Sequence, residues 1–300
     1  MPVIDAIEIY ETHHITEKSD SGILLEARKR LELSGKSHLI PTLEALKNSL
    51  LFRHVLRNQG LSGEGIDYVF QILEGQVDRN ESPLTDADIP FLDLPVVKAT
   101  QQRFQIFQDS LTKLLTFYDK DEPVTICSIP CGFMRDLFSF QSSRKNLTFV
   151  GIDKDPRSLK IAKEKMQTYS SFPHTFLERD ALALEDFKPV DIALSNGFNF
   201  YLDDAKVKTF NFELAKLIKP SGYLIISHIT SLEEWRLKKM DPKALRLEKE
   251  VLQDITRAKF MPFMRTKEKV IEDLELAGFE LLMIIEDEAG RFPTFVLTRT

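Results

Sequence analysis

The sequence predicts an α/β protein with a doubly wound, mostly parallel sheet, preceded by an N-terminal helical region. From Val124 onward, short apolar runs rich in β-branched residues alternate with amphipathic stretches of helical period. This alternation is typical of a parallel sheet with helices on both faces. The last two apolar runs are separated only by EAGRF. A segment this short cannot make a parallel crossover, so we expect the last strand to be antiparallel.

The first part of the chain shows helical periodicity broken by polar turns. Helices are expected at Ile23–Gly35, Leu39–Gly60 and Ile66–Gly75, and all three segments end in glycine, as helices often do. The acidic, proline-bearing stretch Asp78–Pro95 is aperiodic and is interpreted as a linker or exposed loop. It leads into a long amphipathic helix at Val96–Tyr118.

The strands and helices of the sheet region follow from the same patterns. The predicted strands are Val124–Ile129, Leu147–Ile152, His174–Arg179, Val190–Ser195, Tyr223–Ile229, Glu280–Asp287 and Pro293–Thr300. The helices predicted after Val124 are Ser158–Tyr169, Ala205–Ile218 and Thr266–Phe279. We therefore divide the chain into a helical region, 1–94, that serves as a lid or docking element, and an α/β domain, 95–300.

Residues 231–265 fit neither pattern and form a predicted helical insertion in this domain. An insertion after the carboxyl end of a strand lies beside the ligand crevice in such folds. We expect either a substrate lid or a solvent-facing helical flap.

Composition and charge exclude several classes. A net charge of −6 and a pI near 5.7 argue against non-specific nucleic-acid binding. No apolar run approaches the roughly 20 residues of a transmembrane helix, and MPVIDAIEIYE does not resemble a signal peptide. The two cysteines, Cys127 and Cys131, suit a reducing compartment and cannot make a zinc site alone. We expect a cytoplasmic protein without a metal site.

Polar or small residues follow the predicted strands, where ligands of doubly wound sheets bind. Asp153 follows Gly132 by 21 residues, a spacing that places a carboxylate where it can bind two ribose hydroxyls. Asp155 and Asp180 have an alternative interpretation as N-caps of the next helices. The strand-end residues are Pro130, Cys131, Gly132, Asp153, Lys154, Asp155, Asp180, Ala181, Asn196 and Gly197.

The glycine content of the first loop restricts the cofactor. A dinucleotide needs several glycines to bring the backbone against its pyrophosphate. PCGFMRD has one glycine, and the chain contains no G-x-x-x-x-G-K-[ST] motif. The loop therefore favours a ligand made of adenosine and a small group without phosphates.

The succession SIPCGFMRDL, FVGIDKDPRSLKIAKEKM, FLERDALAL, VDIALSNGFNFYL and LIKPSGYLIISHI resembles the class I methyltransferases that use S-adenosylmethionine. The resemblance covers about Val96–Thr300 and implies a seven-stranded sheet. It also implies site roles. The loop Pro130-Cys131-Gly132 would contact the methionine portion, Asp153 the ribose, and Lys154 and Asp155 the adenine. Asp180 would bind the adenine amino group beside Ala181, and Asn196-Gly197 would face the reactive centre.

The first motif departs from the family, because Ser128 stands where an acidic residue is usual. Asp136 on the next helix is a substitute for holding the methionine amino group, although its helical position favours a solvent-facing side chain. Methyl transfer needs mainly alignment, and a base only if the acceptor loses a proton. His228 is the candidate base, with Asp203 as the second choice. The alternative for His228 is a hydrogen-bonded histidine at a strand end.

We expect an enzyme that methylates a small organic acceptor. The N-P-P-Y motif of relatives that methylate nucleobase or glutamine nitrogen is absent, and SNGFNFY replaces it. A protein or RNA acceptor is a second hypothesis, and a catalytically silent scaffold is a third. A nicotinamide oxidoreductase is disfavoured by the missing glycines. A homo-oligomer is compatible with the sequence.

Overall fold

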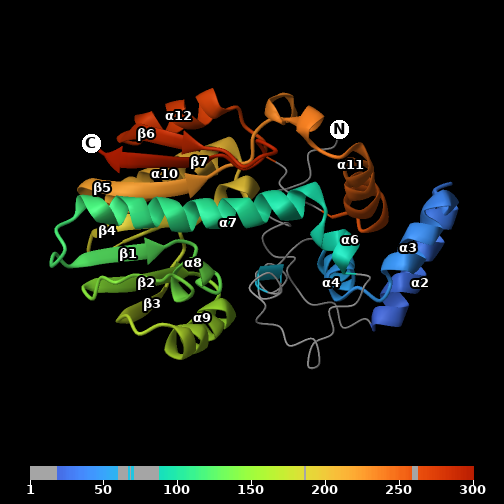
Figure 1. Ribbon diagram of the computed structural model, residues 1–300, viewed down its shortest axis with the longest axis horizontal. Helices are drawn as coiled ribbons and strands as arrows, with labels where there is room; N and C mark the ends of the chain where they lie inside the picture. Colours follow the sequence, from blue (N-terminus) through green and yellow to red (C-terminus); the bar gives the residue numbers. More distant parts are fainter. Residues whose placement is uncertain (1–18, 60–66, 68, 71–87, 186, 259–262) are drawn as a thin grey trace. The chain divides into compact units, whose positions relative to one another are not determined.

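The computed structural model describes residues 19–59, 67, 69–70, 88–185, 187–258 and 263–300 (Figure 1). A seven-stranded sheet has the order β3-β2-β1-β4-β5-β7-β6, and β7 is antiparallel to both of its neighbours. The predicted α/β fold with an antiparallel last strand is confirmed. The strands are β1 Val124–Ser128, β2 Leu147–Asp153, β3 His174–Glu178, β4 Val190–Asn196, β5 Ile218–Ser227, β6 Phe279–Ile285 and β7 Thr294–Arg299.

The strand order reverses between β1 and β4. β1 pairs with β2 on one side and with β4 on the other, and all three strands are parallel. Ser128, the last residue of β1, is opposite both Gly151 and Leu194. The carboxyl ends of these strands therefore meet at one edge of the sheet. Ligands of doubly wound sheets bind at this reversal point.

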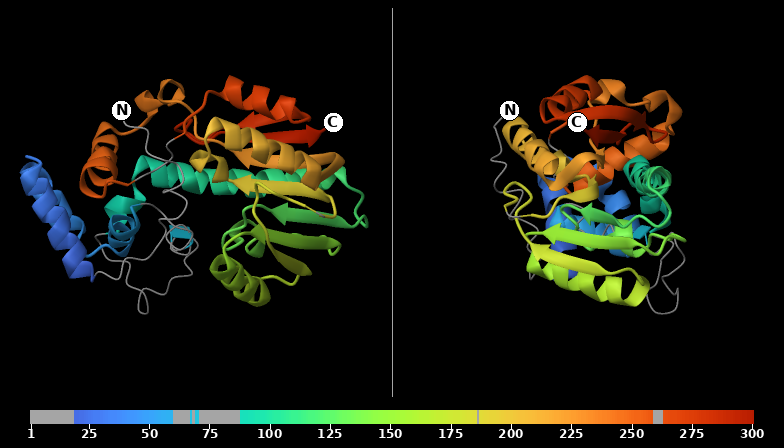
Figure 2. Two further views of the ribbon diagram at one scale, coloured as in Figure 1. Left: turned by 180° about the vertical axis from the view of Figure 1, so that it is seen from behind. Right: turned by 90° about the vertical axis from the view of Figure 1, so that its left-hand side faces the viewer.

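Helices cover both faces of the sheet. In Figures 1 and 2, residues 102–114 of α7 lie across one face, and α10 and α12 lie on the other. The connecting helix α9 packs on β2 and β3. The helices of this region are α7 Pro95–Leu114, α8 Arg135–Phe138, α9 Pro156–Tyr169, α10 Asp204–Leu217 and α12 Lys267–Leu276.

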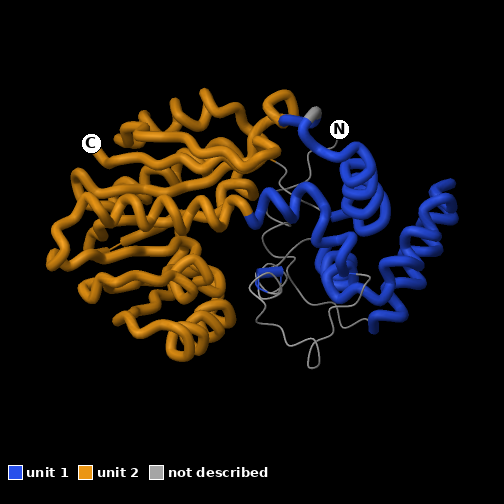
Figure 3. Tube along the Cα trace, in the orientation of Figure 1, with its two compact units in different colours: residues 1–101, 236–262 blue, residues 102–235, 263–300 orange. Residues whose placement is uncertain are grey.

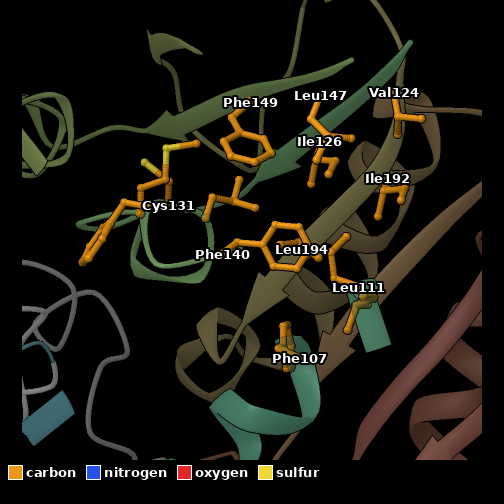
Figure 4. Packing of buried hydrophobic residues seen from close by; sticks show 14 of the residues in the cluster. Phe107, Leu111, Val124, Ile126, Cys131, Phe140, Leu147, Phe149, Ile192 and Leu194 are labelled. Carbon is orange, nitrogen blue, oxygen red and sulfur yellow. The ribbon is translucent and has the colours of Figure 1, made fainter. Parts of the chain in front are cut away.

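The core between α7 and the sheet is aliphatic and aromatic (Figure 4). Phe107 and Leu111 of α7 pack in one cluster with Ile126, Phe149 and Leu194 from three strands, and each is at most 1% exposed. Full burial of such a side chain stabilises the fold by about 1.5–3 kcal/mol. The cluster fixes the strands whose ends carry the candidate site.

The chain forms two compact units (Figure 3). One comprises Met1–Gln101 and Arg236–Pro262, and the other comprises Gln102–Trp235 and Phe263–Thr300. Within the first unit, the Lys36 ammonium lies 2.6 Å from an oxygen of Asp254. The insertion therefore joins the N-terminal helices. The helices of this unit are α2 Asp20–Leu33, α3 Ile40–Leu46, α4 Leu50–Asn58, α6 Ile89–Leu92 and α11 Pro242–Lys249, followed by a π-helical turn, Glu250–Ile255.

Two predicted N-terminal elements differ from the structure. The single helix expected at Leu39–Gly60 is divided into two. The first of the two helices, α3, ends at Leu46, and Ser49 is the N-cap of α4. The Ser49 hydroxyl accepts from the Phe52 amide at 3.0 Å and donates to the buried Asp88 at 2.5 Å. Asp88 belongs to the predicted linker, whose end forms α6 instead. Most of the predicted helix Ile66–Gly75 and linker residues 78–87 lie outside the described residues.

No helix in the described part of the chain combines the length and the apolar character needed to span a membrane.

Candidate functional site

The loop after β1 is tied to the end of β2. The Cys131 amide donates to the Ile152 carbonyl at 2.8 Å, and the Gly132 amide donates to Asp153 Oδ2 at 2.8 Å. Gly132 has φ of +48°, where a side chain would be strained. Pro130 is half-buried, and Cys131 is buried. Burial, followed by the nearby Asp153 charge, raises the pKa of the Cys131 thiol. The sulfur is therefore a neutral packing group rather than a nucleophile.

Asp153 is held rigidly at the strand end. Its second oxygen, Oδ1, accepts from the Asp155 amide at 3.0 Å. Burial raises the pKa of Asp153, and the hydrogen bonds from Asp155 and Gly132 oppose this rise. Each carboxylate oxygen can accept more than one hydrogen bond. This fixed, half-buried carboxylate fits the predicted binding of vicinal hydroxyls.

The other predicted adenosine contacts surround Asp153 on β2 and β3. Asp155 caps α9, since its carboxylate accepts from the Arg157 and Ser158 amides at 3.0 and 3.2 Å. Although burial alone would raise its pKa, hydrogen bonds from Ser158 and Arg157 lower it. Asp180 accepts from the Leu182 amide at 2.9 Å. In addition, Lys154 and Asp180 are exposed and Ala181 is buried.

Asn196, at the end of β4, reaches across to α8. Its Nδ2 donates to Asp136 Oδ1 at 3.0 Å, and its own Oδ1 is buried without a hydrogen-bond partner among the residues that the structure describes. The expectation that Asp136 faces solvent is wrong: it is 9% exposed. The short helix α8 is buried along its whole length. Burial raises the pKa of Asp136, while Asn196, Arg103 and Arg135 counteract that rise.

Arg103 on α7 lies beside Gly197. It is not among the residues that the sequence predicted for the candidate site. Its guanidinium carbon lies 5.2 and 4.8 Å from the ring centres of Phe200 and Phe292, which stack on each other at 5.4 Å. The side chain is 6% exposed, and burial lowers its pKa to about 10. In the sequence, Arg103 is a basic residue on an amphipathic helix, like many arginines that face solvent. Its burial could therefore not be predicted from the local pattern.

Gly197 lets Arg103 approach the turn after β4. It has φ of +94°, and an added Cβ would lie 3.2 Å from Arg103 Nη1 and 3.1 Å from the Phe200 ring. Any side chain here would therefore be strained and crowded. The structure thus brings Asn196, Gly197, Asp136 and Arg103 together.

His228 lies just past the end of β5 and is 2% exposed. Its Nε2 is 2.6 Å from Asn199 Nδ2, an arrangement in which a neutral imidazole accepts from the amide. Burial, with a further contribution from Arg265, lowers its pKa to about 3. The structure thus places His228 as a buried, hydrogen-bonded histidine at a strand end. Asp203, the second candidate base, caps α10 by accepting from the Lys206 amide at 2.8 Å.

The strand order, the glycine loop and the strand-end carboxylates are those expected of a nucleoside-binding site. A comparison with protein families identifies the family of the chain. The model of a methyltransferase domain family matches residues 120–275, just over half of the 300 residues. The chain belongs to the methyltransferase domain family. This methyltransferase domain has its polar site at the β1/β4 reversal point, on Gln102–Trp235 and Phe263–Thr300.

Two solved structures are similar to this chain. A possible exported protein from Bordetella parapertussis is 27% identical, with a TM-score of 0.80 over 94% of this chain and 97% of its own. Magnesium protoporphyrin IX methyltransferase from Synechocystis PCC 6803, with bound S-adenosylhomocysteine, is 13% identical, with a TM-score of 0.52 over 79% of this chain and 94% of its own. The latter likeness shows the fold. Among curated proteins, none matches this sequence significantly.

Proposed function

We propose that this protein transfers a methyl group from S-adenosylmethionine to a small organic acceptor. The observation that carries the proposal is the pairing of Asn196 with Asp136 beside the Gly132 loop. Among the described residues, Asn196 Oδ1 is a buried acceptor without a hydrogen-bond partner, and the same amide donates to the buried Asp136. A buried acceptor without a donor is costly. In this proposal the ammonium group of the methionine portion donates to Asn196 Oδ1 and is attracted by the Asp136 carboxylate.

The remaining cofactor contacts follow the strand ends. In this proposal Pro130, Cys131 and Gly132 border the methionine portion, and Asp153 accepts from the ribose hydroxyls. Lys154 and Asp155 lie beside the adenine, Asp180 accepts from its amino group, and Ala181 packs against the ring. Asp136 takes the role of the acidic residue that Ser128 replaces in the first motif. This assignment is supported by the burial of Asp136 and its bond to Asn196.

The bound cofactor supplies an activated methyl group, and the protein supplies orientation. A well-oriented pair of reactants contributes about 7–11 kcal/mol to lowering a barrier. Asn196 and Gly197 border the reaction centre. His228 acts through Asn199, because its Nε2 accepts from that amide and its low pKa keeps the ring neutral. Asn199 belongs to the short 3₁₀ helix Phe198–Tyr201 that follows Gly197. His228 thus holds the segment beside the reaction centre in place.

A small acceptor is favoured by charge and by aromatic lining. The net charge of −6 disfavours an RNA acceptor. Phe200 and Phe292 stack beside Gly197 and Arg103 and are 4% and 1% exposed, and these buried rings support an apolar surrounding for the reaction centre. The N-terminal helices and the insertion share one compact unit. We also propose that they determine the specificity for the acceptor.

The first experiment is thermal unfolding of the purified chain with S-adenosylmethionine, S-adenosylhomocysteine, NAD or no ligand. Ligand at 100 times its dissociation constant stabilises the native state by about 2.7 kcal/mol. Stabilisation by both sulfur nucleosides and none by NAD is expected. Absence of any shift would overturn the cofactor assignment and favour the silent scaffold. Labelled methyl transfer into small metabolites, rather than into protein or RNA of a lysate, then tests the acceptor class.

We propose a cytoplasmic location, supported by two free, buried thiols, Cys127 and Cys131. The Bordetella protein described as possibly exported is a counter-indication. Cell fractionation with a tagged full-length chain decides between the two, because recovery outside the cytoplasmic fraction would overturn this proposal.

A further inference from the structure

Arg103 is a buried cation that forms no ion pair with a described residue. It is 6% exposed, and its Nε is buried without a hydrogen-bond partner in the described part of the chain. Its interactions with the described residues are the two aromatic contacts and long-range electrostatics with Asp136, Tyr201 and Asp287. No described carboxylate forms a hydrogen bond or an ion pair with it. Burial of a charge is expensive unless an opposite charge compensates it.

The two nearby carboxylates are engaged elsewhere. Asp287 closes the turn between β6 and β7, where it accepts from the Ala289 and Phe292 amides at 3.0 and 2.6 Å. Asp136 Oδ1 accepts from Asn196. Neither one neutralises the guanidinium by direct contact. Within the described residues, the fold thus holds the charged guanidinium in place without an ion pair.

The position of the guanidinium identifies where a ligand would meet it. Nη1 lies against the Gly197 turn, so closely that a Cβ there would be 3.2 Å away. The Phe200–Phe292 stack supports the group from one side. An arginine fixed on aromatic rings keeps its planar fork of N–H donors oriented at little entropic cost. That fork matches a carboxylate in a bidentate geometry.

The surrounding charges select among anions. The groups that act electrostatically on Arg103 are the acids Asp136 and Asp287 and the phenol of Tyr201. The two acidic residues beside the guanidinium repel a multiply charged phosphate more than they repel a monoanion. We propose that Arg103 is a carboxylate-binding residue that holds a ligand's carboxylate between the Gly197 turn and the Phe200–Phe292 stack. The proposal rests on the methyltransferase function proposed above. Two sources have this chemistry, namely the cofactor's methionine portion and an acidic acceptor.

The test measures affinity rather than turnover. Isothermal titration of the full chain uses S-adenosylhomocysteine and its decarboxylated analogue, which keeps the ammonium and lacks the carboxylate. The variants are Arg103→Met, Arg103→Lys and, as a matched control, the exposed Lys113→Met on the same helix. Thermal unfolding of each unliganded variant controls for folding. Methionine packs on the same rings without a buried charge, so Arg103→Met is expected to unfold no earlier than the wild type.

If Arg103 binds the carboxylate of the cofactor, the variants are expected to differ in their affinity for the two nucleosides. The wild type and Lys113→Met bind S-adenosylhomocysteine at least tenfold more tightly than the decarboxylated analogue, since a charged hydrogen bond contributes about 1.5–3 kcal/mol. Arg103→Met removes that preference and leaves the affinity for the analogue within about twofold of the wild type. Arg103→Lys is expected to retain part of the preference for S-adenosylhomocysteine, because a lysine ammonium attracts the carboxylate as a point charge.

If Arg103 binds the carboxylate of the acceptor instead, the affinities are expected to differ for benzoate and not for the nucleosides. Arg103→Met then binds S-adenosylhomocysteine as the wild type does. With that nucleoside saturating, benzoate binds to the wild type but not to Arg103→Met, and benzamide binds to neither. If Arg103→Met equals the wild type for both nucleosides and for benzoate, the inference is overturned. If the wild type binds neither nucleoside, the proposed function fails. Benzoate titration without nucleoside then decides the carboxylate subsite independently.

Discussion

The side-chain amide of Asn196 donates to Asp136 at 3.0 Å and connects the end of β4 to α8 across the glycine loop. This bond leaves Asn196 Oδ1 buried without a hydrogen-bond partner among the described residues. The buried Asp136 pays a desolvation cost in the unliganded protein that a cationic ligand relieves. The predictions below begin with this pair.

Substitution of Asp136→Asn is expected to weaken S-adenosylhomocysteine binding at least tenfold, because a charged hydrogen bond to the ammonium group is lost. The same change is expected to raise the melting temperature of the unliganded protein at pH 7, since burial raises the Asp136 pKa and disfavours its charged form. Titration calorimetry and thermal unfolding measure the two effects. Equal affinity with a lower melting temperature would assign Asp136 a structural role instead.

Cofactor affinity is expected to depend on pH through Asp136. Its raised pKa means that the folded protein retains a proton above the ordinary range of an aspartate. A cation binds to the ionised form, so affinity decreases as the pH falls through the raised pKa. Titrations of wild type and Asp136→Asn from pH 7 to 5 test this dependence. A wild-type slope no steeper than that of the variant would contradict it.

His228 is expected to make stability pH-dependent without serving as a base. Its pKa falls from 6.5 to about 3 on folding, so its contribution to stability is complete above pH 6.5 and is lost as the pH falls toward 3. At pH 5 the loss is about 2 kcal/mol. His228→Gln, which keeps an acceptor for Asn199, is expected to lose less stability between pH 7 and 5. Urea unfolding measures the difference, and parallel losses would refute the assignment.

The role of Asp153 requires a conservative substitution. Its carboxylate holds the Gly132 and Asp155 amides at 2.8 and 3.0 Å, so Asp153→Ala would disturb the loop as well as the ribose contact. Asp153→Asn keeps one acceptor oxygen. It is expected to weaken the binding of adenosine and of S-adenosylhomocysteine by the same factor, about tenfold. Competition binding with both nucleosides provides the measurement. A loss confined to S-adenosylhomocysteine would move the contact of Asp153 away from the ribose.

Gly197→Ala is expected to destabilise the protein by about 1–2 kcal/mol, the cost of the left-handed conformation for a residue with a side chain. The added methyl group also crowds Arg103 and Phe200 at 3.2 and 3.1 Å. Denaturant unfolding measures the cost. Gly35→Ala is a matched control, because it has φ of +71° and no atom near the added carbon. A larger loss of ligand affinity in Gly197→Ala than in Gly35→Ala separates crowding from strain.

Local patterns were sufficient for most of the sheet. The observed strands follow the predicted apolar runs closely, because strands buried on both faces appear in the sequence as short continuous apolar runs. The exception within the sheet region is β5, which begins at Ile218 rather than Tyr223. Residues Lys219-Pro220-Ser221 carry no strand pattern, so the start of the strand depends on the pairing of Ile218 with Val190 of β4.

The sequence by itself determined the fold class, the antiparallel last strand and the strand-end positions of Asp153 and Asn196, since these follow from periodicity and chain order. Only the tertiary structure decided which side chains meet. Asp136 is 60 residues from Asn196, and Asn199 is 29 residues from His228. Arg103 reaches the site from a helix before the first strand. Such pairings arise because packing brings distant segments together, and burial then determines whether a charge is exposed or desolvated.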